Sequence, residues 1–167
     1  MVHIRTATQK ELSTIVAWAA EEGWNPGIDD VGPFWAADPQ GYLVLEDRGE
    51  IKAAISLVRH TPEFAFLGFY MVTPMARGQG LGLTLWQETI ARANGAIVGL
   101  DGVVAQQDNY RKSGFAYAHA NIRYGGHVAV DFAIPRHIVR ADQMPMDQLL
   151  SYDEKHNPYR RDGFMRA

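Results

Sequence analysis

Cysteine is absent from this chain of 167 residues. Its absence excludes disulfides, thiolate metal sites and a cysteine nucleophile, and it agrees with a reducing compartment. A chain of this length buries roughly 68–70% of the surface that its unfolded form exposes, so a single hydrophobic core is sufficient for folding. We therefore expect a cytoplasmic protein that folds without covalent cross-links.

An excess of charge of one sign and long apolar runs are also missing. The 16 Lys and Arg residues are nearly balanced by 19 Asp and Glu residues, whereas nucleic-acid-binding domains are usually basic. No apolar run approaches the roughly 20 residues of a membrane-spanning helix, and residues 1–5 lack the apolar core of a secretory signal. We expect a protein that binds neither nucleic acid nor a membrane.

The pattern of apolar residues predicts strands and helices in alternation. Residues 3–7 are expected to form a strand, and Thr8 and Glu11 form a capping box that begins a helix. Alternating side chains over 42–46 and 51–59 predict a β-hairpin, and the apolar run 64–72 between two prolines predicts a central strand. The other expected elements are helices over 30–37, 83–93 (with Leu83, Trp86, Ile90 and Ala93 on one face), 107–113 and 145–156, a buried strand over 96–100, and a hairpin over 117–124 and 127–134. This order predicts a mixed α/β fold with helices on the faces of one sheet.

The segment Arg77-Gly78-Gln79-Gly80-Leu81-Gly82 lies between the central strand and the helix after it. Glycine lets the backbone approach a ligand closely, and the free N–H groups and the dipole of a helix start attract phosphate. The Walker A pattern requires Gly-Lys-Ser/Thr, which is missing, and the third glycine comes one position too early for the dinucleotide-binding pattern. The segment therefore predicts an anion-binding loop of another kind.

Two segments resemble the signatures of the GNAT superfamily of N-acetyltransferases. Val72-x-Pro74-x-x-Arg77-Gly78-Gln79-Gly80-Leu81-Gly82 resembles the acetyl-CoA signature, and Asn109-Tyr110-Arg111-Lys112-Ser113-Gly114-Phe115 resembles the second signature, Tyr-x-Lys-x-Gly-Phe. The order of elements over residues 2–134 agrees with the same family. The resemblance implies a mixed, mostly antiparallel central sheet of about seven strands flanked by helices, with acetyl-CoA as co-substrate.

The resemblance also assigns roles to residues. A backbone N–H near Met71 or Val72 would polarise the thioester carbonyl. Tyr110 would protonate the departing thiolate, because the phenol pKa of about 10 exceeds the thiol pKa of about 8.5. The family's asparagine seven residues before this tyrosine is replaced by Val103. The implied cofactor-binding residues are Met71, Val72, Arg77, Gly78, Gln79, Gly80, Leu81, Gly82, Asn109 and Lys112, and Asn109 or Gln106 could take the place of the missing asparagine.

The sequence offers several candidates for the general base. The run 64–72 lacks the glutamate that many relatives carry there. Asp101 is the first candidate, because ligands of such sheets bind beyond the carboxyl ends of strands. A structural role for Asp101, in an Asx-turn with Gly102, explains this residue equally well. Glu63, His60 and a chain of water molecules are the alternatives.

In relatives the loop after the first helix lines the acceptor pocket, and here it contains Trp24, Asn25 and Asp29. An aromatic ring with a carboxylate suits a cationic amine, although simple packing is as good an explanation of Trp24. No His, Asp or Glu cluster has the spacing of metal ligands, so no metal is expected.

We therefore expect direct transfer of the acetyl group to an amine of a small molecule or peptide, without an acyl-enzyme, since no suitable nucleophile is evident. The alternative is a non-catalytic acyl-CoA-binding regulatory module. The segments 23–27 and 100–107 resemble a bacterial subgroup that often carries a second C-terminal domain. We expect an acetyltransferase domain over residues 1–134 and an extension over 135–167, where a linker to a second domain could begin. The last hairpin and the helix after Pro145 could form a homodimer.

Overall fold

The computed structural model describes residues 1–122, 124–127, 135–157 and 159–167. They form two units, one made of residues 1–100 together with 146–167, and one made of residues 101–145. The predicted division into a domain over 1–134 and an extension over 135–167 stays a prediction. Within the described ranges, no helix combines the length and the apolar character needed to cross a membrane.

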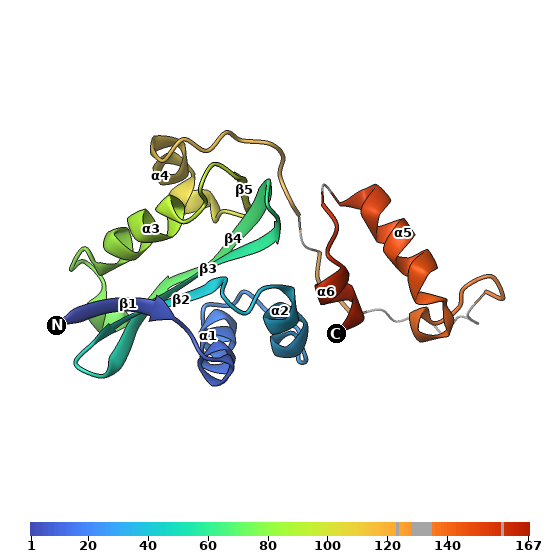
Figure 1. Cartoon of the computed structure of the whole chain (residues 1–167), viewed down its shortest axis with the longest axis horizontal. Helices are drawn as coiled ribbons and strands as arrows, with labels where there is room; N and C mark the ends of the chain where they lie inside the picture. The colour runs from blue at the N-terminus through green and yellow to red at the C-terminus, as the bar shows by residue number, and fades with distance from the viewer. Residues whose placement is uncertain (123, 128–134, 158) are drawn as a thin grey trace. The chain divides into compact units, whose positions relative to one another are not determined.

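The first unit is built on one sheet (Figure 1). Its strands are β1 (Val2–Thr6), β2 (Tyr42–Asp47), β3 (Glu50–Thr61), β4 (Phe64–Val72) and β5 (Ile97–Leu100), and they lie in sequence order. The pairs from β1 to β4 are antiparallel, and β5 is parallel to β4. The predicted mixed, mostly antiparallel α/β fold is confirmed, with five strands in the described part of the chain where about seven were expected.

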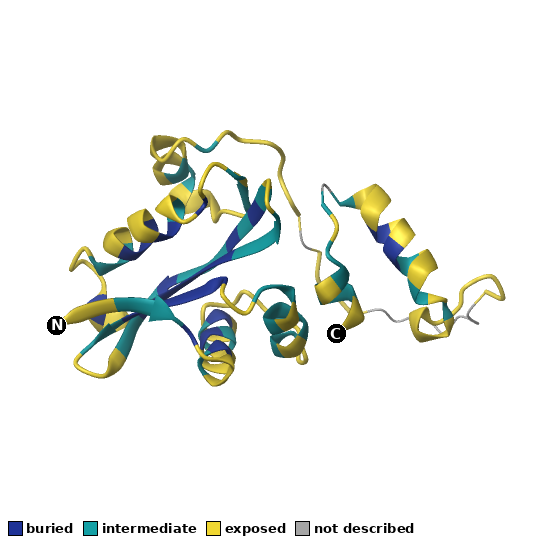
Figure 2. Cartoon of the chain, viewed as in Figure 1, coloured by how far each residue is buried: buried dark blue, intermediate teal, exposed yellow. Residues whose placement is uncertain are grey.

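Helices cover both faces of this sheet (Figures 1 and 2). On one face lie α1 (Gln9–Glu21), which begins with the predicted capping box, and α2 (Val31–Ala37). The buried core between α1 and the sheet consists of Ala7, Leu12, Ile15, Ala19, Tyr42, Val44, Ala54 and Met71. Because side chains alternate along a strand, Leu43 and Leu45 face the other way, towards α3 (Leu81–Ala91).

Two expectations about burial were wrong. The buried side chains of α3 are Leu85, Trp86 and Thr89, whereas Leu83 is 59% exposed. The helix begins at Leu81, and its phase turns Leu83 away from the sheet. The strand β5 was expected to be buried, but Ile97 is 72% exposed, because β5 is the outermost strand among the described residues.

Residues 146–167 fold onto the first unit through α5 (Met146–His156) and α6 (Asp162–Arg166). Phe164 of α6 stacks on Phe34 of α2 with ring centroids 6.0 Å apart. A side chain at Gly163 would meet the carbonyl oxygen of Ala36 at 2.9 Å, so glycine allows this close contact. The segment is therefore anchored on α2 by an aromatic contact and a close backbone approach.

The second unit contains α4 (Gln107–Lys112), which ends as predicted before Gly114, a glycine with a φ of 91°. Short 3-10 turns lie at Val104–Gln106 and Ala141–Gln143. The expectation of a strand over 117–124 is wrong for residues 117–122, which have no regular structure. In the described ranges they meet no strand to pair with. Most of the other expected strand, residues 128–134, lies outside the described residues.

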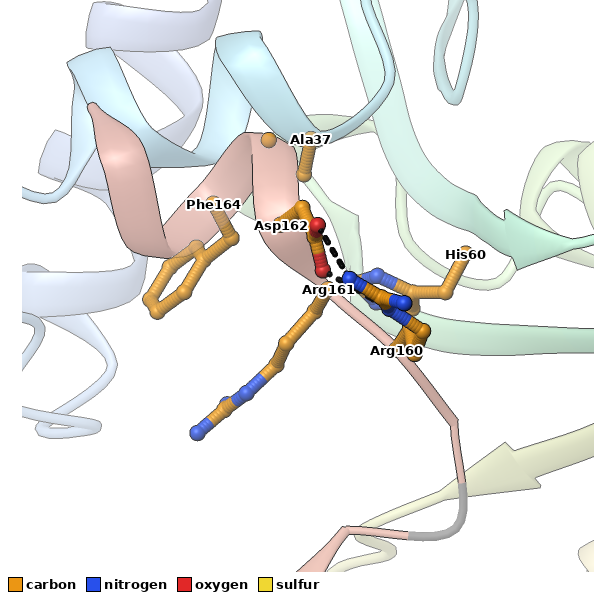
Figure 3. Close-up of a pocket in the computed structure, with 7 residues that line it drawn as sticks. Ala37, His60, Arg160, Arg161, Asp162 and Phe164 are labelled. Carbon is orange, nitrogen blue, oxygen red and sulfur yellow. Dashed lines mark hydrogen bonds and ion pairs between the residues drawn. The ribbon is translucent and has the colours of Figure 1, made fainter. Parts of the chain in front are cut away.

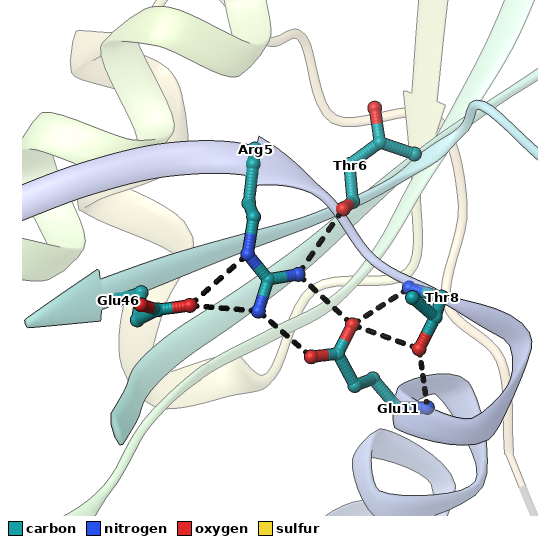
Figure 4. Close-up of polar contacts among 5 residues, drawn as sticks. All are labelled: Arg5, Thr6, Thr8, Glu11 and Glu46. Carbon is teal, nitrogen blue, oxygen red and sulfur yellow. Dashed lines mark hydrogen bonds and ion pairs between the residues drawn. The ribbon is translucent and has the colours of Figure 1, made fainter. Parts of the chain in front are cut away.

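A charged network joins β1, β2 and the start of α1 (Figure 4). The guanidinium of Arg5 donates to both carboxylate oxygens of Glu11, at 2.7 and 2.9 Å, and to Glu46 at 2.8 and 3.0 Å. Glu11 also accepts from the backbone N–H of Thr8 at 2.7 Å. The Arg5 hydrogen bond, followed by the Thr8 contacts, lowers the pKa of Glu11 to about 2.

We predict that Glu11→Gln lowers the free energy of unfolding at neutral pH by about 1 kcal/mol, because glutamine keeps the cap but loses the ion pair with Arg5. A carboxyl with a lowered pKa stabilises the fold above its ordinary pKa and loses this contribution as pH falls towards 2. Urea denaturation between pH 7 and pH 2.5 should therefore show a weaker acid dependence in the variant. The matched control is Glu88→Gln, which breaks an exposed ion pair with Arg92. An acid dependence equal to that of the wild type would contradict the account.

Candidate functional site

The glycine loop connects the end of β4 to the start of α3. After Val72 comes a short turn, Pro74–Ala76, and α3 begins at Leu81. Gly78 and Gly80 have φ values of 76° and 77°, a left-handed conformation that costs side-chain-bearing residues energy and glycine very little. Gly80 is the N-cap residue of α3. These two glycines are therefore required by the backbone path itself.

The backbone N–H groups at this helix start have no hydrogen-bond acceptor among the described residues. None of the hydrogen bonds among the described residues uses the N–H groups of residues 78–83. The next N–H group along the chain, that of Thr84, donates to Gly80 O at 3.1 Å. The first turn of α3 contains no acidic residue. Consecutive free N–H groups at the positive end of a helix dipole form a binding site for an anion such as phosphate.

Cationic side chains lie beside the loop. A hollow of about 260 Å³ is lined by Asp47, Arg48, Lys52, Met75, Ala76, Gln79 and Leu81. The side chain of Gln79 donates to Met75 O at 2.9 Å, which holds the loop against the preceding turn. Arg77, one of the predicted cofactor residues, donates to Val72 O at 3.0 Å and to the carboxylate of Glu22 at the end of α1. In this structure Arg77 therefore ties the loop to α1.

The strand before the loop has an unpaired edge. β5 pairs with β4 only from Phe64 to Leu67, whereas β4 continues to Val72. In the described part of the chain no strand pairs with residues 68–72 on that edge. An extended group lying there could use the backbone groups of β4 as another strand would. The predicted cofactor residues Met71 and Val72 lie on this segment, next to the glycine loop.

A β-bulge interrupts the pairing of β4 with β3 at the same place. Gly68 pairs with Ser56 and Met71 pairs with Ala54, so that two residues of β4 stand opposite Ile55. Phe69 in the bulge has a φ of 47°. The sequence analysis missed this feature; its one signal was Gly68, since an isolated glycine within a strand often marks a bulge.

The loop between α1 and α2 contains the three predicted acceptor residues, Trp24, Asn25 and Asp29. Trp24 is 36% exposed, and its backbone N–H donates to Ala19 O at 3.0 Å. Asn25 has a φ of 52°, in the left-handed region. The carboxylate that shapes the loop is that of Asp30, which accepts from Gly27 N at 2.7 Å. Asp29 is exposed in the same loop.

The second unit carries the two predicted catalytic residues, Tyr110 and Asp101. Burial raises the pKa of the Tyr110 phenol, which therefore stays protonated at neutral pH. Its ring meets Phe115 edge-on at 6.4 Å. Asp101 is exposed and accepts from the side-chain amide of Asn121 at 2.9 Å. Asn109 donates to Gln106 at 2.6 Å, and Lys112 is exposed.

The alternative bases, His60 and Glu63, lie around the turn between β3 and β4, at the end of β4 opposite the glycine loop. His60 borders a hollow of about 220 Å³, lined also by Ala37 and by residues 160–164 (Figure 3). Burial, followed by the charge of Arg161, lowers the pKa of His60. Since a strand rises about 3.3 Å per residue, roughly 26 Å of β4 separates this hollow from the loop.

Comparisons with known proteins give the same fold and family. The chain is 31% identical over 162 residues to a holothin acyltransferase from Pseudoalteromonas sp. (strain SANK 73390), covering 97% of this chain and 55% of that protein. A candidate acetyltransferase from Pyrococcus horikoshii superposes with a TM-score of 0.72 at 15% identity, over 99% of this chain and 60% of that one. A predicted acetyltransferase from Clostridium acetobutylicum, solved with acetyl-CoA, superposes with a TM-score of 0.55 at 19% identity, over 75% and 96%.

The chain spans about half the length of the curated relatives it matches. The solved structures share its fold at low sequence identity, whereas the sequence itself establishes the family. The sequence model of the acetyltransferase (GNAT) family matches residues 9–116, which include the glycine loop and α4. The chain therefore belongs to the acetyltransferase (GNAT) family.

Proposed function

We propose that this chain is an N-acetyltransferase that binds acetyl-CoA at the glycine loop and transfers the acetyl group directly to an amine of a small molecule or peptide. The observation that carries the proposal is that, among the described residues, the N–H groups of residues 78–83 have no acceptor and the adjoining edge of β4 has no pairing strand. The pyrophosphate of CoA would accept from these N–H groups. The pantetheine arm would follow the edge of β4 over residues 68–72.

The proposed transfer is a single step without an acyl-enzyme. The amine nitrogen attacks the thioester carbonyl carbon, whose oxygen is polarised by a backbone N–H near Met71 or Val72. The carbon–sulfur bond breaks, and Tyr110 gives its proton to the departing thiolate. Asp101 or water removes the proton of the amine. Trp24, Asn25 and Asp29 would contact the acceptor.

A second function has one observation in its favour. β4 has the sequence Phe-Ala-Phe-Leu-Gly-Phe-Tyr-Met-Val and carries no acidic side chain that could serve as a base. A non-catalytic acyl-CoA-binding regulatory module needs none. The two functions are separated by the release of CoA thiol from acetyl-CoA with a panel of amines: an enzyme releases it, and a binding module does not.

The loop is tested by a matched pair of substitutions at Gly80. Asparagine and aspartate have nearly the same shape, and a side chain at this position would meet no other atom within 4 Å. Both variants carry the cost of the left-handed φ, to which Asn and Asp adapt best. Only aspartate places a negative charge beside the bound pyrophosphate.

We expect Gly80→Asp to weaken CoA binding about 100-fold or more, through charge repulsion in a partly desolvated site, and Gly80→Asn to weaken it far less. Isothermal titration calorimetry with CoA measures both, and thermal melts check that the two variants are equally folded. Equal affinities of the two variants for CoA would mean that no phosphate binds at this loop.

The proposed acid is tested by Tyr110→Phe. Loss of a general acid typically lowers turnover about 10²–10⁴-fold, and we expect the affinity for acetyl-CoA to change little. The readout is steady-state release of CoA thiol beside direct binding of acetyl-CoA. Tyr117→Phe is the matched control, because Tyr117 belongs to the same unit and is 61% exposed. Unchanged turnover in Tyr110→Phe would remove this residue from the mechanism.

A further inference from the structure

Ser56 carries a buried hydroxyl without a hydrogen-bond partner in the described part of the chain. It lies in the middle of β3 and is 3% exposed. The other two buried polar side chains there, Thr89 and Asp153, are both hydrogen-bonded. Buried hydroxyl groups are nearly always paired. Each fully enclosed side-chain oxygen or nitrogen atom of the described residues has a partner, so the Ser56 hydroxyl oxygen keeps an opening to the surface.

This opening lies over Gly68 of β4. Gly68 pairs with Ser56, and a Cβ atom added at Gly68 would lie 3.2 Å from Ser56 Oγ. Apart from the neighbours of Gly68 in the chain, that Cβ would meet no other described atom within 4 Å. The hydroxyl therefore leans over the backbone of Gly68, at the floor of a space that a side chain at position 68 would fill. A lone glycine within a strand often marks a place where a ligand approaches the backbone.

Gly68 is also the residue at which the sheet opens. β5 pairs with β4 as far as Leu67, so Gly68 is the first residue of the edge over 68–72 that has no pairing strand in the described part of the chain. Neighbouring strands lie about 4.8 Å apart. The Ser56 hydroxyl is thus about one strand spacing from the edge along which the pantetheine arm is proposed to lie.

The two faces of the sheet differ beside this edge. On the α3 face, the ring of Tyr70 packs on Trp86 with centroids 5.2 Å apart. Ser56 points to the other face, because it pairs with Tyr42 of the core beneath α1. That face also carries α2 and the loop between the two helices. An amine that attacks a thioester at this edge therefore reaches it over Gly68, where the space is open.

We propose that the Ser56 hydroxyl is an acceptor-binding group, which accepts a hydrogen bond from the attacking amine over Gly68 and so turns the nitrogen lone pair towards the thioester carbonyl. The proposal rests on the function proposed above and adds a residue that holds the reacting nitrogen. A hydroxyl can accept this hydrogen bond without taking the proton, which still passes to Asp101 or water. Gly68 keeps the approach open.

The first test is Ser56→Ala with hydroxylamine as the probe amine, because hydroxylamine is uncharged at neutral pH and needs little contact beyond its nitrogen. The loss of one hydrogen bond predicts a roughly tenfold lower kcat/KM for hydroxylamine, with unchanged affinity for acetyl-CoA. Ser56→Thr keeps the hydroxyl and should retain most of the activity. Ser13→Ala, at an exposed serine of α1, is the control. The readout is release of CoA thiol above the spontaneous rate.

The second test uses the absence of cysteine from the chain. Ser56→Cys places a single thiol at the floor of the opening, where iodoacetamide reports its accessibility. We expect alkylation that bound acetyl-CoA slows about tenfold or more, because the acyl end then covers the opening. Ala53→Cys, at a fully buried position of the same strand, is the control and should be alkylated slowly with or without acetyl-CoA. Mass spectrometry measures both rates.

Three results would overturn the proposal. In the first, Ser56→Ala turns over hydroxylamine as fast as the wild type. In the second, a wild type that binds acetyl-CoA shows no turnover of hydroxylamine. In the third, the Ser56→Cys variant is not alkylated, or is alkylated equally fast with acetyl-CoA bound. Failure of the wild-type protein to bind acetyl-CoA at all would instead overturn the function proposed for the glycine loop.

Discussion

The two edges of β4 are paired over different lengths, and the rest of the site depends on this difference. β3 accompanies β4 along its whole length, whereas β5 accompanies only its first four residues. α3 begins just beyond the unpaired end. Within the part of the chain that the structure describes, a strand edge without a pairing strand and a helix start whose N–H groups have no acceptor therefore lie next to each other. Both are unsatisfied hydrogen-bonding groups, and an extended molecule with an anionic end satisfies them together.

The parts of the fold that the sequence predicted correctly are those determined by local chemistry. Thr8 and Glu11 cap α1 as expected, because a capping box involves residues only three positions apart. The β2–β3 hairpin and β4 lie where alternation and flanking prolines placed them. The incorrect expectations concern partners far away in the chain. The burial of Leu83 and Ile97 depends on which elements cover them, and residues 117–122 would need a neighbouring strand to become one.

The candidate site divides in the same way. The glycine loop could be read from the sequence, because left-handed backbone at Gly78 and Gly80 demands glycine and the helix start follows directly. The bulge at Phe69 could not, because it arises from the register of β4 against β3. The ion pair between Arg77 and Glu22 could not be predicted from the sequence either, since only the fold brings these two residues together.

The central claim is that acyl-CoA occupies the start of α3 and the open edge of β4 together. Amide hydrogen exchange with and without CoA measures this directly, residue by residue. The account predicts slower exchange on CoA binding for the N–H groups of residues 78–83 and within residues 68–72, with little change in β1 and α1. CoA binding that protects amides elsewhere, and leaves these two segments unchanged, would contradict it.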